Sequence, residues 1–170
     1  MSPASASSVT VDFDTRSSDA DSSDYTSTSG SLTFSAGETS KSVNVSVLED
    51  TLDEANETVT LTLSNASGAS IGDETGTLTI NDDDDEPSLS INNVTVTESA
   101  GTGTLRVSLS TASGKGVSFS YAITGGTATS GSDYTTTSGS YTISAGDTYQ
   151  DIAVTIIDDS SEESTTAETI

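Results

Sequence analysis

The sequence contains no cysteine and no histidine, and it has only 4 lysine and arginine residues against 27 aspartate and glutamate residues. Without cysteine the chain cannot form disulfides, zinc–thiolate sites or a thiol nucleophile. Without histidine it lacks the usual general base and the commonest transition-metal ligand. A formal net charge of −23 argues against nucleic-acid partners, because so few cations cannot neutralise a phosphate backbone. These absences predict that the protein is not an enzyme and does not bind nucleic acid.

Long hydrophobic runs are absent as well. No stretch approaches the roughly 18 apolar residues that a membrane-spanning helix needs, so we expect no direct membrane insertion. The first residues, Met-Ser-Pro-Ala, do not resemble a secretory signal peptide. We therefore expect any export signal to have been removed or to lie elsewhere in a longer chain.

What the sequence does contain is a two-residue alternation of apolar and polar side chains. The alternating segments are 43–47, 59–63, 105–109, 117–123 and 152–156. This period is typical of strands with one buried and one exposed face, and no comparable stretch has the 3.6-residue period of a helix. The pattern predicts an all-β protein and argues against a disordered chain, although the composition alone would be compatible with one.

The chain also repeats itself. Residues 23–37 read SDYTSTSGSLTFSAG and residues 132–146 read SDYTTTSGSYTISAG, an offset of 132 − 23 = 109. The match extends backward with one gap, so that Val9, Val11 and Phe13 align with Val117, Phe119 and Tyr121. The repeat is therefore about 110 residues long, and about one and a half repeats are present.

The phase of the repeat predicts the domain organisation. The acidic tract 82–86 and Pro87 mark the junction between two copies. Residues 1–86 are expected to form a repeat that lacks its first two strands, and residues 87–170 a repeat that lacks its last strands. Such truncated repeats would have open strand edges, which recruit partners. We expect strand exchange between molecules, giving a homo-oligomer, or a permuted domain in which 88–97 and 103–110 complete the first copy.

Turn-forming residues between the alternating segments predict where each strand begins and ends. These are 9–15, 31–35, 41–48, 57–64 and 75–81 in the first copy, and 88–97, 103–110, 116–123, 139–144 and 149–157 in the second, with the start of another at 166–170. Combining the two copies gives seven strands per repeat, which predicts immunoglobulin-like β-sandwich repeats.

If consecutive strands run antiparallel, the acidic residues of each repeat collect at one end of the sandwich. Asp19, Asp21, Asp24, Glu49, Asp50, Asp53, Glu54 and Asp82–Asp85 then lie at one end of the first copy; Glu98, Asp133, Asp158, Asp159, Glu162 and Glu163 lie at the same end of the second. Carboxylates gathered in this way repel one another unless they point into water or share a cation. Oxygen ligands on flexible loops favour Ca²⁺ over Mg²⁺ and over transition metals.

Several separated motifs occur in order in both copies. They include Ser23-Asp24-Tyr25, Leu48-Glu49-Asp50 and Thr79-Ile80-Asn81-Asp82 in the first copy, and Gly131-Ser132-Asp133-Tyr134 and Ile157-Asp158-Asp159 in the second. With these motifs the chain resembles the Calx-beta domain family over nearly its whole length. This family includes the regulatory Ca²⁺-binding domains of sodium–calcium exchangers and tandem modules of bacterial surface proteins.

The resemblance implies a seven-stranded sandwich that binds Ca²⁺ at the loop end. Carried over by motif, the expected metal ligands are Asp24, Glu49, Asp50, Glu54, Asp82, Asp83 and Asp84 in the first copy, and Glu98, Asp133, Asp158, Asp159 and Glu163 in the second. Neither set is complete within its own copy. Two alternatives remain open: the tract 82–86 is a solvated linker, or Asp24 and Asp133 close Asx turns before the tyrosines.

We expect a calcium-binding structural or adhesion module of a tandem-repeat surface protein, located outside the cell, in which Ca²⁺ makes the junction between neighbouring repeats rigid. One alternative is a regulatory Ca²⁺ sensor of a transporter or enzyme, which would bind Ca²⁺ at micromolar rather than millimolar concentration. Another is an adhesin module that binds a ligand. The low aromatic content of 5% gives little support to a stacking platform for sugars.

Overall fold

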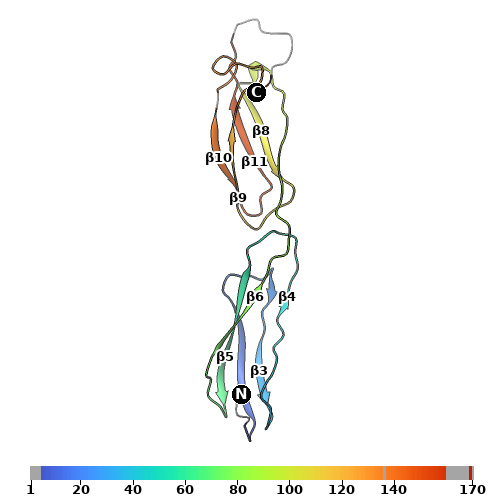
Figure 1. The fold of residues 1–170 in the computed structure, drawn as a ribbon, viewed down its shortest axis with the longest axis vertical. Helices are drawn as coiled ribbons and strands as arrows, with labels where there is room; N and C mark the ends of the chain where they lie inside the picture. The colour runs from blue at the N-terminus through green and yellow to red at the C-terminus, as the bar shows by residue number, and fades with distance from the viewer. Residues whose placement is uncertain (1–4, 136, 160–168, 170) are drawn as a thin grey trace. The chain divides into compact units, whose positions relative to one another are not determined.

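The computed structural model describes residues 5–135, 137–159 and 169. Within these residues the chain forms antiparallel strands and one short 3₁₀ helix, as Figure 1 shows. The elements are β1 (Val9–Ser17), β2 (Tyr25–Thr26), β3 (Ser29–Phe34), β4 (Ser46–Val47), β5 (Glu57–Ser67), β6 (Thr75–Ile80), β7 (Leu89–Ile91), η1 (Glu98–Ala100), β8 (Thr102–Leu109), β9 (Val117–Ala122), β10 (Ser138–Ile143) and β11 (Tyr149–Thr155). The all-β prediction is confirmed. None of the described segments is a helix of the length and apolar character needed to cross a membrane.

The chain divides into two compact units. Unit 1 comprises the chain up to Thr51 together with Ala55–Asp83. Unit 2 comprises the short segment Leu52–Glu54 together with the chain from Asp84 onward. Each unit has two β-sheets and buried apolar side chains of its own.

Unit 1 contains a four-stranded antiparallel sheet in the order β3-β1-β5-β6 and a second sheet of β2 and β4. Period-two alternation along β1 buries Val9 and Val11, and the same period in β5 buries Val59. Val59 forms a core cluster with Ala20 and Tyr25, against which Val45 and Ile80 pack. This cluster brings the chain before β2 close to the start of β5.

Unit 2 contains a three-stranded antiparallel sheet in the order β11-β8-β7 and a second sheet of β10 and β9. Alternate residues of β8 and β11 supply much of its core, since β8 buries Val107 and Leu109 and β11 buries Ile152 and Val154. Tyr134, in the loop before β10, is also buried. The inward residues are those that the alternating pattern predicts.

The repeat is visible in the backbone pairing. Tyr25 pairs with Val47 in unit 1, and Tyr134 pairs with Ile156 in unit 2, each partner displaced by 109 positions. Likewise, β1 pairs with β3 as β9 pairs with β10. The two units therefore carry the same local architecture, and each can serve as a template for the other.

The predicted strand 41–48 is mostly wrong, because only Ser46–Val47 has strand pairing. Its repeat equivalent in unit 2 is β11, which forms seven pairs with β8. Among the described residues no strand pairs with 40–45. The alternating sequence alone does not make a strand, since a strand needs a neighbour for its backbone N–H and C=O groups.

The strand predicted at 88–97 is also shorter in the structure, where β7 ends at Ile91. The backbone N–H of Arg106 donates a hydrogen bond of 2.6 Å to the side-chain oxygen of Asn92, and not to a backbone carbonyl of the neighbouring strand. The ladder between β7 and β8 stops there, as expected when a side chain competes with the backbone.

The pairing of β7 with β8, and of β8 with β11, also bears on the expected permuted domain. Both strands belong to the second unit, so the arrangement in which they complete the first copy is not adopted. Of the predicted strand 166–170, only Thr169 lies within the described residues.

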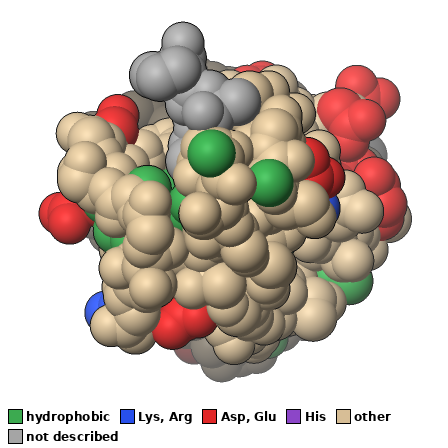
Figure 2. Space-filling view, turned by 90° about the horizontal axis from the view of Figure 1, so that it is seen from below, with side chains coloured by type: hydrophobic (Ala, Val, Ile, Leu, Met, Phe, Trp, Pro, Cys, Tyr) green, Lys and Arg blue, Asp and Glu red, His purple; other side chains and the backbone are tan. Residues whose placement is uncertain are grey.

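The surface reflects the excess of acidic over basic residues. Figure 2 shows one face, on which Asp and Glu side chains are spread among mostly uncharged surface. Hydrophobic side chains on this face are scattered. This face has no single dominant charged or apolar patch.

Candidate metal centre

Two candidate ligands that lie close together in unit 1 are Asp24 and Glu57. Asp24 directly precedes β2 and is 8% exposed, while Glu57 is the half-buried first residue of β5. A carboxylate oxygen of Asp24 lies within 4.8 Å of a carboxylate oxygen of Glu57. The core contact between Tyr25 and Val59 explains this approach, because each acid lies one or two residues from a member of that contact.

The backbone around Asp24 is held on two sides. Its carbonyl oxygen accepts a hydrogen bond of 2.8 Å from the Leu48 N–H, and one of its carboxylate oxygens accepts one from the Asp21 N–H. This bond runs backward to Asp21 and is not the Asx turn before Tyr25 that the sequence left open, which would use the N–H two residues further on. The carboxylate remains positioned beside Glu57.

Two carboxylates at this separation repel each other. At an effective dielectric constant near 20, two unit charges about 4.8 Å apart raise the free energy by about 3 to 4 kcal/mol. Burial of Asp24 reduces the share of water in screening this repulsion. The arrangement therefore favours a cation between the two side chains.

Asp19 connects the loop before Asp24 to β5. Its carboxylate accepts hydrogen bonds of 2.6 Å from the Thr58 N–H and 2.8 Å from the Thr58 hydroxyl. The hydroxyl, and after it the backbone N–H, lowers the pKa of Asp19 from its ordinary value. Asp19 thus stays ionised and fixes the loop to the strand that begins with Glu57.

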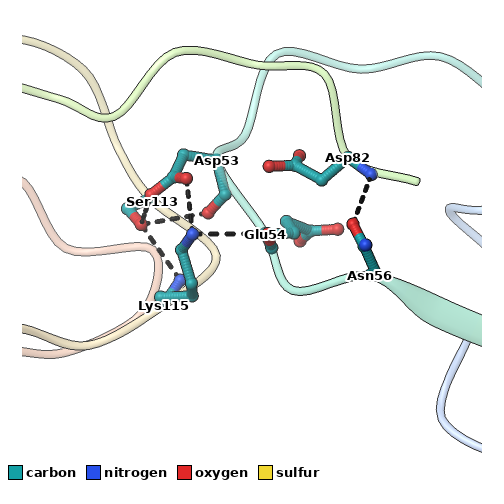
Figure 3. A network of polar contacts seen from close by, with 6 residues as sticks. All are labelled: Asp53, Glu54, Asn56, Asp82, Ser113 and Lys115. Carbon is teal, nitrogen blue, oxygen red and sulfur yellow. Dashed lines mark hydrogen bonds and ion pairs between the residues drawn. The ribbon is translucent and has the colours of Figure 1, made fainter.

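The other predicted ligands of the first copy lie in the segments that follow β4 and β6. Glu49 and Asp50 are exposed and follow β4, and Glu54 is half-buried three positions before Glu57. Asp82, just after β6, donates its N–H to the Asn56 side-chain oxygen at 3.1 Å, as Figure 3 shows. Next in the chain come the exposed Asp83 and the half-buried Asp84.

Asp53 behaves differently from the acids with which the sequence groups it. It is 5% exposed, and its carboxylate lies 2.5 Å from the Lys115 ammonium and 3.2 Å from the Ser113 hydroxyl (Figure 3). Lys115 also reaches the Glu54 carbonyl oxygen at 3.3 Å. These contacts all belong to unit 2. Because its charge is paired with Lys115, Asp53 is part of the packing of that unit and a poor metal ligand.

In the second copy Asp133 reproduces the local structure of Asp24. Its carbonyl oxygen accepts a hydrogen bond of 2.9 Å from the Ile157 N–H, and its carboxylate accepts one from the Thr129 N–H. Ile157 is the repeat equivalent of Leu48. As at Asp24, the side-chain bond runs to a preceding residue and is not the Asx turn before the tyrosine.

The remaining predicted ligands of the second copy do not gather in the described part of the chain. Glu98 is half-buried in η1, and Asp158 and Asp159 are exposed after β11. Glu163 lies outside the described residues. Within those residues unit 2 holds no group of three carboxylates as close as Asp24 and Glu57.

Glu57 is the candidate that the sequence reasoning missed. It has the same strand register as Val59, Leu61 and Leu63, the alternating residues of the predicted strand. A carboxylate in an inward register is unfavourable unless it has a partner. That mismatch between residue type and register was the available signal.

Comparisons with known proteins agree with the repeat. The family model described as Calx-beta domain matches residues 1–84 and 81–169. No curated protein matches the chain.

Among solved structures, CBD12 from CALX1.2 is 23% identical, with a TM-score of 0.45, and the match covers 92% of this chain and 65% of that one. The calcium binding domain CBD12 of CALX1.1 is 20% identical, with a TM-score of 0.46 and coverages of 87% and 62%. The apo form of the Calx CBD1 domain is 23% identical, with a TM-score of 0.44 and coverages of 46% and 73%. The chain spans less than two thirds of the length of the first two structures.

Proposed function

Since the chain belongs to the Calx-beta family, whose model matches it twice, we propose that it binds Ca²⁺ through carboxylates at the loop ends of its immunoglobulin-like β-sandwich repeats. The observation that carries this proposal is the proximity of Asp24 and Glu57. We place the centre of the first site at this pair.

The chemistry of the available ligands supports Ca²⁺. Ca²⁺ binds six to eight oxygen atoms at about 2.3–2.6 Å, so two oxygens on one ion can be at most about 5 Å apart. The oxygens of Asp24 and Glu57 lie within this limit. The chain has no histidine or cysteine to attract zinc or copper instead.

Further ligands would come from the segments that follow β4 and β6. Glu54, Glu49 and Asp50 precede Glu57 in the chain, and Asp82–Asp84 follow β6. For the second repeat the proposal keeps Glu98, Asp133, Asp158, Asp159 and Glu163 as candidates. The local similarity of Asp133 to Asp24 supports this part of it.

The proposed role is structural and non-catalytic. Asp82–Asp84 lie where one family match ends and the next begins, so an ion held there would make the junction between neighbouring repeats rigid. This role suits a repeat module of a surface or adhesion protein outside the cell, where such modules bind Ca²⁺ with Kd values of about 10⁻⁴–10⁻³ M. The partners would be neighbouring repeats, in the same chain or in a strand-exchanged homo-oligomer.

Calorimetric titration with Ca²⁺ tests the proposal. We expect binding to the wild-type chain and a loss of at least tenfold in affinity for the first site in Asp24→Asn/Glu57→Gln. The matched control is Asp73→Asn/Glu74→Gln, which removes the same charge from the connection between β5 and β6. No heat and no change in melting temperature at millimolar Ca²⁺ would contradict the proposal, whereas micromolar affinity would favour the regulatory sensor.

A further inference from the structure

A side chain completes the ladder between β1 and β5. The last pair of this ladder is Ser17 with Val59. One further backbone bond follows, from the Ser18 N–H to the Thr58 carbonyl oxygen at 3.2 Å. A regular antiparallel pair would return a bond from the Thr58 N–H to a backbone carbonyl of β1. Here that N–H donates instead to the Asp19 carboxylate at 2.6 Å, so the backbone of the first strand is free to turn away from β5.

The loop after Asp19 leads to the candidate metal ligands. Ala20 is fully buried in the core cluster of unit 1. The Asp21 N–H then donates to the Asp24 carboxylate, which lies beside Glu57. Asp19 is thus the point at which the loop that ends with Asp24 is attached to the strand that begins with Glu57.

Asp19 acts on Glu57 through the neighbouring residue Thr58. The Oδ1 atom of Asp19 accepts one bond from the Thr58 N–H and a second, of 2.8 Å, from the Thr58 hydroxyl. Because the Thr58 N–H belongs to the peptide group that joins Glu57 to Thr58, the first bond fixes the backbone at Glu57. On the other side of β5, Glu57 pairs with Ile80 of β6. The start of β5, where a strand would otherwise tend to fray, is therefore held from both sides.

Unit 2 uses the same contact with a different residue. In the alignment of β1 with β9, Asp19 corresponds to Thr127, since 127 − 19 = 108, and the Glu-Thr-Val of residues 57–59 recurs as Glu-Thr-Ile at 168–170. The Thr169 N–H donates to the Thr127 hydroxyl oxygen at 2.9 Å, as the Thr58 N–H donates to Asp19. Thr127 carries no charge. What the two positions share is a side-chain oxygen that accepts this bond.

We propose that Asp19 is a positioning residue for the Ca²⁺ site of unit 1, which holds Asp24 and Glu57 close together by accepting the hydrogen bonds of Thr58. This inference rests on the proposed function. Asp19 acts through Thr58 and does not itself bind the ion. A site that is arranged before the ion arrives binds more tightly, because the apparent Kd rises as the fraction of chains in the binding-competent conformation falls.

Calorimetric titration of two Asp19 variants with Ca²⁺ tests this role. Asp19→Ala removes the acceptor oxygen, and we expect the affinity of the first site to fall about tenfold or more, as is usual when a residue that orients a metal ligand is lost. Asp19→Asn removes the charge but keeps an acceptor oxygen, as Thr127 does in unit 2, so it should keep most of the affinity. Equal losses in the two variants would show that Asp19 acts through its charge and would overturn the proposal.

Two control variants separate positioning from a general effect on unit 1. Asp21→Ala removes the same charge from the same loop, but the Asp21 carboxylate accepts its bonds from Ser23 and not from β5. Gly68→Ala destabilises unit 1 at a residue with a φ of +85°, without changing the bonds to Thr58. Both controls should bind Ca²⁺ nearly as the wild type does. If either lowers the affinity as much as Asp19→Ala, the proposal is wrong.

Hydrogen exchange in the Ca²⁺-free chain examines the contact without the ion. The Thr58 N–H should exchange at least tenfold faster in Asp19→Ala than in the wild type, whereas Asp24→Asn/Glu57→Gln should leave it protected. Unchanged protection in Asp19→Ala would overturn the proposal. If the wild type binds Ca²⁺ and Asp19→Ala binds it equally well, this inference alone fails; if the wild type binds no Ca²⁺, the proposed function fails and this inference fails with it.

Discussion

The Lys115 ammonium lies 2.5 Å from the Asp53 carboxylate, although the two residues are 62 positions apart. The Asp53 side chain is 6% exposed, whereas that of Lys115 is 42% exposed. Ser113, itself 1% exposed, donates its hydroxyl to Asp53 and accepts the Lys115 N–H at 3.0 Å. The segment Leu52–Glu54 is thereby fixed within unit 2 by a buried carboxylate that contacts both Lys115 and Ser113.

The first prediction concerns this pair. Lys115→Met should destabilise unit 2 by about 1–3 kcal/mol, because it leaves the Asp53 carboxylate buried without its cation. Urea denaturation followed by circular dichroism measures the change. Lys41→Met is the matched control, since Lys41 pairs with Glu38 on the surface, where such a pair contributes about 0–1 kcal/mol. Equal effects of the two substitutions would show that burial of Asp53 does not matter.

The second prediction concerns acid stability. The pKa values of Asp151 and Asp19 lie below the ordinary value of 3.8, because of hydrogen bonds from Arg106 and from Thr58 respectively. A depressed pKa in the folded state stabilises the protein fully above the unfolded pKa, and this stabilisation is lost as the pH falls through the folded pKa. We therefore expect the free energy of unfolding to decrease as the pH is lowered below about 4.

The matched variants for this prediction are Asp151→Asn and Asp147→Asn. Arg106 holds Asp151 through two bonds of 2.7 and 2.8 Å and lies over the Tyr149 ring at 3.8 Å. Unfolding measured from pH 6 to pH 2.5 should show a smaller pH slope only for Asp151→Asn. If both variants keep the wild-type slope, Asp151 has no part in the acid transition.

The third prediction concerns the left-handed backbone at Gly68, where φ is +85°. Gly68→Ala should cost about 1 kcal/mol or more, because alanine disfavours this conformation and its Cβ would lie 3.0 Å from the Ser8 carbonyl oxygen. Gly76→Ala in β6 is the control, since a Cβ there meets nothing within 4 Å. Thermal unfolding should lower Tm for the first variant and leave it unchanged or raised for the second.

The fourth prediction concerns the effect of Ca²⁺ on stability. A ligand that binds only the folded chain at 100 times its Kd stabilises it by about 2.7 kcal/mol. We expect added Ca²⁺ to raise Tm, excess chelator to reverse the rise, and Glu57→Gln alone to reduce it. If Glu57→Gln keeps the full Ca²⁺-induced rise in Tm and Glu54→Gln shows a smaller one, the site is not centred on the Asp24–Glu57 pair.

Much of the fold follows from local patterning. The alternating residues after Val9 and around Val59 predict β1 and β5 closely, since a two-residue period needs only a buried and an exposed face. The segment 41–48 shows where this reasoning fails. Its sequence resembles a strand, but among the described residues it has pairing only at Ser46–Val47, and strand formation depends on a partner as well as on the chain itself.

The candidate site divides in the same way. The acidic residues that flank the strands are evident in the sequence, as is the equivalence of Asp24 and Asp133. The sequence did not identify Glu57 as a candidate ligand, nor did it identify the ion pair between Asp53 and Lys115. Long-range packing decides which of many carboxylates meets another charge, and an excess of similar acids gives no local sign of the choice.

By itself, the sequence determined the β-class of the protein, its repeat of 109 positions and its selection of oxygen over nitrogen or sulfur ligands, because these depend on residue type and spacing. Tertiary structure alone decided that Asp24 lies beside Glu57 and that the charge of Asp53 is paired with Lys115. Each of these outcomes depends on which distant segment occupies the neighbouring position, and that is settled by packing and backbone hydrogen bonding between segments.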